Sequence, residues 1–525
     1  MENHKMHLTN ALRRARRLRG NDIALVDGER RFTWNEFVDR IARQAGLFHS
    51  LGMKRGDRIA ILANNNSTFI ETYFGPVWAG GMISSLNTRH SVSEITACLN
   101  DSGAKILLIG NSHVSMLPEI RQGARDLRHV LLIDEEGPLP DGTQSYEEMM
   151  ASAEPVEDAM CGGDDVACLY YTGGTTGQPK AVMLTHNNLW FNALGTSGDI
   201  GMREDSTALV SGPLFHLGSG SRVYSGVIAG ATLVVLPQFS LPEVLDTIDR
   251  EQVTHATVVP TMLNSIVNWP GIEKYDFRSL RLVSYGASAI PESLLLKTLE
   301  VFPNSRMLQT YGMTETSPAV SILRHEDHLP PPGKEGRRRS AGRPITTAEV
   351  RIVDAEDREL PTGTVGEVVV RGPMVMKGYW NQPELTAETL RGGWMHTGDA
   401  GYMDEDGYLY IADRIKDMII SGGENVYSAE VENALYKHPD IAECAVVGIP
   451  HEKWGEAVHA VIVLKDGASL TAEDVIAHCR TLIAGYKCPK SVEFSAEPLP
   501  KSGPGKILKK AVRERFWQDQ SRRIN

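Results

Sequence analysis

Short runs of β-branched and aliphatic residues recur up to about residue 345, and stretches with the spacing of amphipathic helices separate them. The predicted strands lie at residues 59–62, 106–109, 130–133, 233–236 and 256–259. Strands that alternate with helices in this way predict layered α/β structure with largely parallel sheets. Residues 67–81 predict one helix that ends at Gly80 and Gly81, and an apolar stretch at 82–86 follows it.

The pattern changes after residue 345 to short strands bounded by turn residues, for example 367–371, followed by Gly372 and Pro373, and 407–411. This pattern predicts a β subdomain with antiparallel pairing. The last hundred residues favour strands at 444–447 and 458–464 and a helix at 471–484, for which Thr471 is the expected N-cap. We therefore expect a compact α+β domain at the C-terminal end.

Composition adds limits on the class of protein. A chain of 525 residues exceeds what one hydrophobic core organises, and 42% hydrophobic with 23% charged residues is typical of a soluble globular protein. Acidic residues outnumber basic ones by 66 to 54, so the net charge of -12 disfavours nucleic-acid binding. The six cysteines show no metal-ligand or disulfide spacing, which favours a reducing, cytoplasmic location.

No apolar run is long enough for a transmembrane helix or for the core of a signal peptide. Two basic clusters stand against the acidic composition, one near the start of the chain and one at 337–339; the first comprises Arg13, Arg14, Arg16, Arg17 and Arg19. We expect them to be solvated surface, and a phosphate-binding or peripheral membrane patch is the alternative. A homodimer also remains open.

The densest chemical signal is Tyr-Tyr-Thr-Gly-Gly-Thr-Thr-Gly-Gln-Pro-Lys at 170–180, directly after an apolar run. Glycines allow backbone N–H groups to face an anion, and the threonine hydroxyls and the lysine add donors and charge. The pattern differs from a Walker A loop, because a proline precedes the lysine. It predicts a polyphosphate-binding loop formed by Thr172, Gly173, Gly174, Thr175, Thr176, Gly177 and Lys180.

This loop resembles the signature loop of the adenylate-forming superfamily, which contains acyl-CoA synthetases, nonribosomal peptide synthetase adenylation domains and beetle luciferases. The resemblance continues in order along nearly the whole chain. It includes Tyr-Gly-Ala-Ser at 285–288, Gln-Thr-Tyr-Gly-Met-Thr-Glu-Thr at 309–316, Trp-Met-His-Thr-Gly-Asp at 394–399, the segment 413–425 and Pro-Lys-Ser-Gly-Pro-Gly-Lys at 500–506.

The resemblance implies an ATP site with several distinct parts. Asp399 would hold the ribose hydroxyls, Arg414 would reach ribose and phosphate, and Glu315 would bind Mg²⁺ beside the phosphates. Catalytic roles are implied for Thr175, Glu315, His216 and Lys506, the last as a mobile cation that contacts the reacting oxygens. The remaining nucleotide contacts would come from Gly286, Ala287, Ser288, Gln309, Thr310, Tyr311, Gly312 and Thr314.

The resemblance further implies two large parts joined by a hinge. Residues 1–412 would form the N-terminal AMP-binding domain, 413–416 the hinge with Lys416, and 417–525 a small mobile α+β domain. Rotation about the hinge would let one site serve two chemical steps. Gly422 and Gly423 match the backbone along which the family binds the pantetheine arm of coenzyme A.

The acid pocket matches residues 213–221, which contain no carboxylate to pair with an amino-acid ammonium. His216 resembles the histidine that acyl- and aryl-CoA synthetases place near the substrate carboxylate. Gly218, Gly220 and Gly312 would leave room for a medium- or long-chain fatty acid or an aromatic acid. We expect Arg222 to point outward; the alternative is an inward arginine that could pair with a second carboxylate of the substrate.

These implications predict an acyl-CoA synthetase, a stand-alone ligase that converts ATP, a carboxylic acid and coenzyme A into acyl-CoA, AMP and diphosphate through an acyl-adenylate, with Mg²⁺. An adenylating enzyme that delivers its acyl group to a carrier protein is the main alternative. A luciferase-type oxygenase and an inactive binding protein are weaker ones, because Thr175, Glu315, Asp399, Arg414 and Lys506 are all present.

Overall fold

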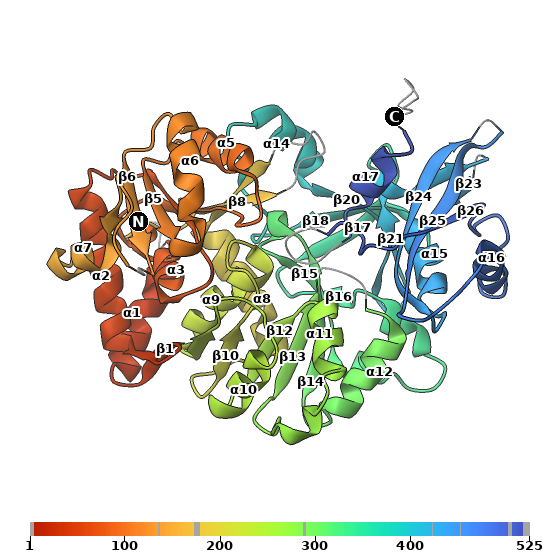
Figure 1. Cartoon of the computed structure of the whole chain (residues 1–525), viewed down its shortest axis with the longest axis horizontal. Helices are drawn as coiled ribbons and strands as arrows, with labels where there is room; N and C mark the ends of the chain where they lie inside the picture. The colour runs from red at the N-terminus through yellow and green to blue at the C-terminus, as the bar shows by residue number, and fades with distance from the viewer. Residues whose placement is uncertain are drawn as a thin grey trace.

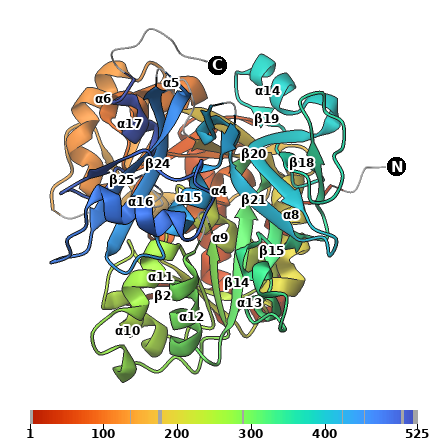
Figure 2. The same cartoon turned by 90° about the vertical axis from the view of Figure 1, so that its right-hand side faces the viewer.

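The computed structural model describes residues 5–134, 137–172, 179–286, 290–422, 424–451, 453–501 and 507–517, which form four sheets. Figure 1 shows the N-terminal elements on the left, the yellow-green to green segment around residues 200–320 below, and the C-terminal elements on the right. In Figure 2 the C-terminal elements face the viewer beside the strands of the small third sheet.

The first sheet has the order β19-β9-β8-β4-β3-β5-β6-β7. Its pairs are parallel from β8 to β7, while β9 pairs antiparallel with both β8 and β19. The strands are β3 (Arg58–Leu62), β4 (Met82–Ser85), β5 (Ile106–Gly110), β6 (His129–Ile133), β7 (Gln144–Ser145), β8 (Val166–Thr172), β9 (Lys180–Thr185) and β19 (Gly378–Tyr379). The strands expected at 59–62, 106–109 and 130–133 are therefore confirmed, and the apolar stretch at 82–86 contains β4.

The second sheet has the order β16-β15-β14-β13-β12-β10-β11-β1-β2 and is parallel from β14 to β1. The strands expected at 233–236 and 256–259 are β11 and β12. Its members are β1 (Ile23–Asp27), β2 (Arg30–Thr33), β10 (Thr207–Val210), β11 (Thr232–Val235), β12 (His255–Val258), β13 (Leu282–Gly286), β14 (Arg306–Gly312), β15 (Ala319–Leu323) and β16 (Arg343–Pro344).

Helices cover these sheets, and one large apolar cluster joins residues from both sheets to helices α1, α2, α8 and α9. The main helices of this half are α1 (Leu8–Arg19), α2 (Trp34–Ser50), α3 (Ser67–Thr72), α4 (Gly75–Trp78), α5 (Val92–Ser102), α6 (Leu117–Gly123), α7 (Tyr146–Ser152), α8 (His186–Ile200), α9 (Leu217–Ala229), α10 (Glu243–Arg250), α11 (Pro260–Val267), α12 (Glu292–Val301), α13 (His325–His328) and α14 (Pro383–Thr389).

The single helix expected at 67–81 is wrong in its continuity. It consists of two short helices, α3 and α4, which Tyr73 and Phe74 separate. Pro76 explains the break, because proline has no N–H to donate to the preceding turn and its ring clashes with that turn. It is tolerated at the start of α4, where a helix has no use for that N–H.

The third sheet is antiparallel, with β17 (Glu349–Val353), β18 (Gly366–Arg371), β20 (Met395–Met403) and β21 (Leu409–Arg414). The fourth contains β22 (Ile419–Ser421), β23 (Glu424–Val426), β24 (Ile441–His451), β25 (Gly455–Leu464) and β26 (Ser491–Phe494), with α15 (Ser428–Leu435), α16 (Ala472–Arg480) and α17 (Lys509–Glu514). Thr471 caps α16 in a capping box with Asp474. The α/β fold class, with a β subdomain and a small C-terminal domain, is confirmed; the boundaries at 412 and 416 remain a prediction.

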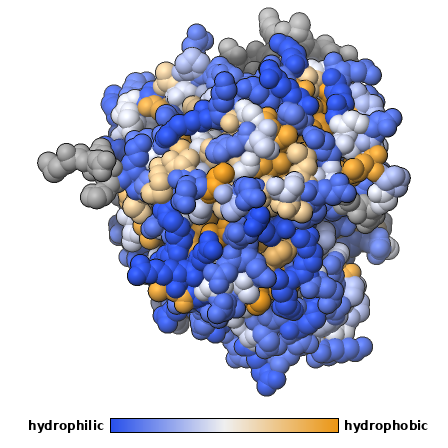
Figure 3. All heavy atoms as spheres, turned by 90° about the vertical axis from the view of Figure 1, so that its left-hand side faces the viewer, coloured by the Kyte–Doolittle hydropathy of each residue, from blue (hydrophilic) through white to orange (hydrophobic). Residues whose placement is uncertain are grey.

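The basic cluster near the start of the chain lies on α1 and is largely paired with acidic residues. Arg13 contacts Asp158, and Arg14 contacts Glu204. Figure 3, which views the N-terminal side, shows hydrophobic residues in small groups among predominantly hydrophilic ones. No helix in the described part of the chain is both long and apolar enough to cross a membrane. All six cysteines are buried and free.

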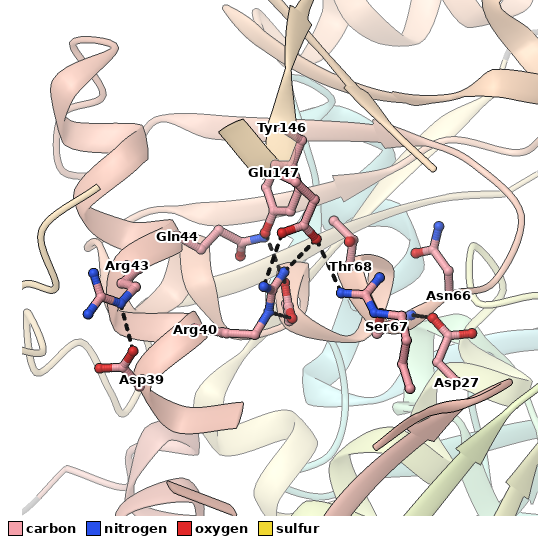
Figure 4. A network of polar contacts seen from close by, with 12 residues as sticks. Asp27, Asp39, Arg40, Arg43, Gln44, Asn66, Ser67, Thr68, Tyr146 and Glu147 are labelled. Carbon is pink, nitrogen blue, oxygen red and sulfur yellow. Dashed lines mark hydrogen bonds and ion pairs between the residues drawn. The ribbon is translucent and has the colours of Figure 1, made fainter. Parts of the chain in front are cut away.

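A buried ionic network joins α2, α3 and α7 (Figure 4). Arg40 forms ion pairs with Glu71 and Glu147, and the Glu71 side chain is 0% exposed. The hydroxyl of Tyr146 donates to Glu71 at 2.9 Å, and Gln44 donates to that hydroxyl at 2.8 Å. Because each buried charge has hydrogen-bond partners, this network meets the condition under which burial of ions is tolerated.

Candidate active site

The carboxyl ends of β13 and β14 carry two glycines that the packing requires. A Cβ atom on Gly286 would lie 2.7 Å from the carbonyl oxygen of Thr310 on the neighbouring strand. Gly312 has φ +155°, and its Cβ would lie 1.8 Å from the carbonyl oxygen of Pro318. Larger residues would push these strand ends apart. The edge of a parallel sheet at its carboxyl ends is where ligands commonly bind.

Tyr311, Asp399 and Arg414 meet beside this edge. The Tyr311 hydroxyl donates to Asp399 at 2.6 Å, and the Arg414 Nε lies 2.6 Å from the other carboxylate oxygen. Asp399 and Arg414 are partners in the register of β20 and β21, so the sheet itself positions the pair. The Asp399 side chain is 4% exposed and the Arg414 side chain 35%. Burial and the charge of Asp399 hold the pKa of Tyr311 well above its usual range.

Glu315 and Lys180 are connected through a residue that the sequence analysis missed, Tyr379. The Tyr379 hydroxyl donates to Glu315 at 2.8 Å, and the Lys180 ammonium donates to that hydroxyl at 3.4 Å. Burial and the Glu315 charge raise the pKa of Tyr379, so the hydroxyl stays protonated. Burial lowers the pKa of Lys180. Tyr379 lies on β19, which pairs with β9, and no local motif identifies such a distant partner.

A cavity of about 120 Å³ adjoins the same edge. The cavity is lined by residues of the expected nucleotide site and by residues of α8, α9, α11 and β12. Its nucleotide side includes Gly286, Thr310, Gly312 and Thr314. The other walls include Asn192, Thr196, Gly212, His216, Gly218, Ser221, Arg222, Ser225, Thr257, Val259, Met262 and Ser284. The cavity therefore extends from the strand ends into the space between α9 and the second sheet.

His216 precedes the first residue of α9 and lines this cavity. Its Nδ1 accepts a hydrogen bond of 3.1 Å from the backbone N–H of Gly218, which caps the helix. Burial lowers the pKa of the imidazole, so the ring is neutral at pH 7. Because Nδ1 accepts, the ring proton lies on Nε2. His216 thus offers one N–H donor to a ligand oxygen.

Arg222 also lines the cavity, which corrects the expectation that it points outward. Its Nε donates to the hydroxyl of Thr257 at 3.0 Å. That hydroxyl lies 2.7 Å from the hydroxyl of Ser284 on the next strand. The orientation follows from the packing of α9 on β10 and β11 of the second sheet, from which Arg222 reaches Thr257 on β12, and the sequence near Arg222 does not reveal this contact.

The two other glycines of the expected acid pocket differ. Gly218 lines the cavity. A Cβ on Gly220 would instead lie 2.2 Å from the Tyr73 hydroxyl and 2.8 Å from the Tyr170 hydroxyl. Gly220 is therefore small because buried tyrosines pack against it, and it contributes no open space.

Several predicted residues lie outside the described residues: Gly173, Gly174, Thr175, Thr176, Gly177, Ala287, Ser288, Gly423 and Lys506. Their flanks are described. Thr172 and Lys180 are paired at the ends of β8 and β9, and Lys501 and Ile507 form a β-bridge. The two described ends of the expected polyphosphate-binding loop, Thr172 and Lys180, therefore lie side by side, and Lys180 contacts Tyr379.

The expected hinge residue lies between the third and fourth sheets, and the described coenzyme A residue, Gly422, lies within the fourth. Lys416 is exposed in the short turn after β21. Gly422 has φ +64° in the turn between β22 and β23, and its N–H donates to the Trp454 carbonyl at 2.9 Å. A left-handed turn alone accounts for this glycine. The hinge and pantetheine roles therefore remain predictions.

Comparison with known proteins extends this picture. The AMP-binding enzyme family matches residues 12–380, and the AMP-binding enzyme C-terminal domain matches residues 430–506. A feruloyl-CoA synthase of Amycolatopsis sp is 40% identical over 506 residues, which cover 96% of this chain and 98% of the relative. A fatty acid–[acyl-carrier-protein] ligase of Streptomyces coeruleorubidus is 35% identical and covers 94% of both chains.

Among solved structures, an anthranilate CoA ligase in complex with anthranoyl-AMP has a TM-score of 0.90 at 28% identity and covers 98% of both chains. The fold, the two family matches and the full-length relatives agree with the resemblance drawn from the motifs. The chain therefore belongs to the AMP-binding enzyme family and is an AMP-forming acid–thiol ligase related to acyl- and aryl-CoA ligases.

Proposed function

We propose that this enzyme activates an aromatic carboxylic acid with ATP and transfers the acyl group to coenzyme A. In the first step a carboxylate oxygen attacks the α-phosphorus of ATP, and diphosphate leaves. In the second step the thiol sulfur attacks the acyl carbonyl carbon, and AMP leaves. The observation that carries the proposal is the cavity, because it joins the strand ends carrying Gly286 and Gly312 to His216.

His216 would orient the acid for the first step. Its Nε2–H can donate to one carboxylate oxygen and leave the other free to attack. A neutral ring suits this role, since a full positive charge would reduce the nucleophilicity of the carboxylate. Lys506 would supply charge where the two anions meet, because attack of a carboxylate on a phosphate develops negative charge on oxygen.

The nucleotide would lie along the edge formed by β13, β14 and β20. The Asp399 carboxylate can accept from both ribose hydroxyls, and Arg414 can donate to ribose and phosphate oxygens. In the structure these two groups and Tyr311 contact one another, so nucleotide binding would exchange these contacts for contacts to the ribose.

Glu315 and Lys180 fit the polyphosphate. Mg²⁺ prefers oxygen ligands and takes one or two protein carboxylates together with phosphate oxygens and water. Glu315 supplies such a carboxylate, and the described residues contain no cluster of three metal-binding side chains that would hold a metal alone. Bound Mg²⁺ would neutralise phosphate charge, while Tyr379 keeps Glu315 and Lys180 in place.

Two observations favour an aromatic acid over a long fatty chain. A cavity of about 150 Å³ is known to bind benzene, so the cavity of about 120 Å³ is comparable with one small ring. Its far wall carries Arg222, Thr257 and Ser284, polar groups that would face the tail of a fatty acid without a partner. The feruloyl-CoA synthase relative also acts, by its name, on an aromatic acid.

Delivery to a carrier protein is the second candidate, because one full-length relative is named for that reaction. Diphosphate release with a panel of aromatic and fatty acids, measured with coenzyme A or with a phosphopantetheinylated carrier protein, tests both. We expect diphosphate release and thioester formation with aromatic acids and coenzyme A. Diphosphate release with thioester on the carrier alone would favour the second candidate, and activity confined to long fatty acids would contradict the proposed acid.

A further inference from the structure

Arg222 is a partly buried cation that the reaction described above does not use. Of its five N–H donors, one from Nε bonds to Thr257, and the described residues place no carboxylate at ion-pair distance from it. Burial lowers its pKa to about 10, so the side chain still carries its charge at neutral pH. The terminal nitrogens are therefore available to a molecule in the cavity.

An unpaired buried charge is costly, and proteins usually pair it or bind a counter-ion to it. Arg222 is also fixed in direction, because its Nε bond to Thr257 is supported by the contact of Thr257 with Ser284. We call these three residues the distal polar cluster. A fixed, unpaired guanidinium on a cavity wall is suited to a ligand oxygen, which it can bind through two parallel donors.

The distal polar cluster lies at the end of the cavity away from the reacting carboxylate. Arg222 follows His216 by six residues on α9, which corresponds to roughly 9 Å along a helix axis. Ser284 precedes Gly286 by two residues on β13, which corresponds to roughly 7 Å along a strand. Both estimates place the cluster roughly 7–9 Å from the nucleotide side, about the length of a benzene ring that carries a substituent at each end.

We propose that the distal polar cluster is a specificity site that selects acids with a second oxygen acceptor, a carboxylate or a phenolic oxygen, at the end remote from the reacting carboxylate. The inference rests on the proposed function and defines its substrate class more narrowly. A second carboxylate gains an ion pair as well as hydrogen bonds, so we expect it to be preferred over a phenolic oxygen. A ring without such a group covers the guanidinium and leaves it without an ionic partner.

The test compares matched acids and matched variants of the full-length enzyme. The acids are benzoate and cinnamate, each unsubstituted, with a 4-hydroxyl group and with a 4-carboxyl group. For the parent enzyme we expect kcat/KM for thioester formation to favour an oxygen-bearing acid by about 10- to 100-fold, the range typical for a hydrogen bond to a charged group. In Arg222→Met this ratio should fall to about one, and Arg222→Lys should keep part of the preference for the 4-carboxyl acids.

Arg278→Met is the control, since Arg278 is exposed and its one ion pair among the described residues is with nearby Asp276, and its ratio should equal that of the parent. A second measurement requires no turnover: the 4-carboxyl acids should raise the melting temperature of the parent and not that of Arg222→Met. If Arg222→Met does not fold, Thr257→Val tests the same idea, because it removes the contact that directs the guanidinium.

The outcomes separate the two proposals. An unchanged ratio in Arg222→Met, or no preference in the parent, would overturn the specificity site while thioester formation still supported the proposed function. A structural role for Arg222 would lower kcat/KM equally for all six acids and also contradicts the inference. No thioester from any of these acids would instead overturn the proposed aromatic-acid activity.

Discussion

Arg40 and Arg222 are two arginines in the N-terminal half whose surroundings are opposite. Arg40 pairs with Glu71 and Glu147, and Tyr146 completes the network (Figure 4). Burial would lower the pKa of Arg40, but the charge and hydrogen bond of Glu71 together with the hydrogen bond of Glu147 outweigh that effect and raise it. Arg222 has a hydroxyl partner, and burial lowers its pKa. The first arginine is satisfied within the protein, whereas the second lines a cavity.

The difference teaches how a buried charge can be interpreted. A charge whose partners all come from the protein contributes to the folded structure, and removal of one partner leaves the other buried and uncompensated. A charge with too few protein partners beside a cavity indicates a ligand. Variants of residues of the first kind should lose stability, and variants of residues of the second kind should lose activity at nearly unchanged stability.

The largest effect is expected at Glu71. Glu71→Gln keeps the shape and removes the charge, so it should cost about 3–5 kcal/mol of unfolding free energy, as for other broken buried pairs. Urea unfolding followed by circular dichroism measures this. Asp39→Asn is the matched control, because the Asp39–Arg43 pair lies on the same helix α2 with the Asp39 side chain 41% exposed, and should cost less than about 1 kcal/mol. Equal losses in both variants would refute the distinction.

Lys506→Ala should show the next largest effect, on rate alone. Loss of a preorganised charge contact costs about 10²- to 10³-fold, so acyl-adenylate formation should fall by that factor. Thioester formation from a supplied acyl-adenylate should be spared, since diphosphate is no longer being displaced. Single-turnover measurement of the two half-reactions tests this. The assignment is incorrect if both half-reactions slow equally.

Asp399→Asn tests a buried ion pair that serves a ligand. We expect the KM for ATP to rise by about 10- to 100-fold, because hydrogen bonds to a charged group are lost. Stability should change far less than in Glu71→Gln, since the partner Arg414 is 35% exposed and can be solvated. A fall in melting temperature as large as that of Glu71→Gln, with the KM for ATP unchanged, would show that Asp399 stabilises the fold and does not bind the nucleotide.

The parts of this architecture that the sequence predicted are those set by local patterns. The apolar runs became β3, β5, β6, β11 and β12, because a buried parallel strand needs a continuous run of apolar residues. The helix predicted at 67–81 is too long, because its apolar pattern continues through Pro76. The ring of that proline and its missing N–H interrupt the helix at Tyr73 and Phe74.

Site residues followed the same division. Tyr311, Glu315, Asp399 and Arg414 could be predicted as site residues because each belongs to a continuous motif, and the structure brings Tyr311, Asp399 and Arg414 into contact. The inward direction of Arg222 and the role of Tyr379 could not be predicted, because both depend on contacts between distant segments. Tyr379 reaches Lys180 across 199 positions of the chain, and such a pairing becomes visible only when β19 adds to the edge of β9.

The smallest effect is expected at Tyr379, which acts on the polyphosphate site through other residues. Tyr379→Phe removes the hydroxyl that donates to Glu315 and accepts from Lys180. A neutral hydrogen bond contributes about 1 kcal/mol net, so the KM for MgATP should rise roughly fivefold. The KM for the acid should stay the same, because the described residues around the acid cavity do not include Tyr379. Initial rates at varied MgATP and at varied acid separate the two constants. Tyr410→Phe is the control, since its hydroxyl donates to Asp404 at 3.2 Å on the third sheet, away from the cavity. Two outcomes would contradict this prediction: an equal rise in the KM for MgATP in Tyr410→Phe, or a rise of both constants together in Tyr379→Phe. Either would show a general loosening of the fold. Tyr379 would then stabilise the protein, as Glu71 does, and would not support the polyphosphate site.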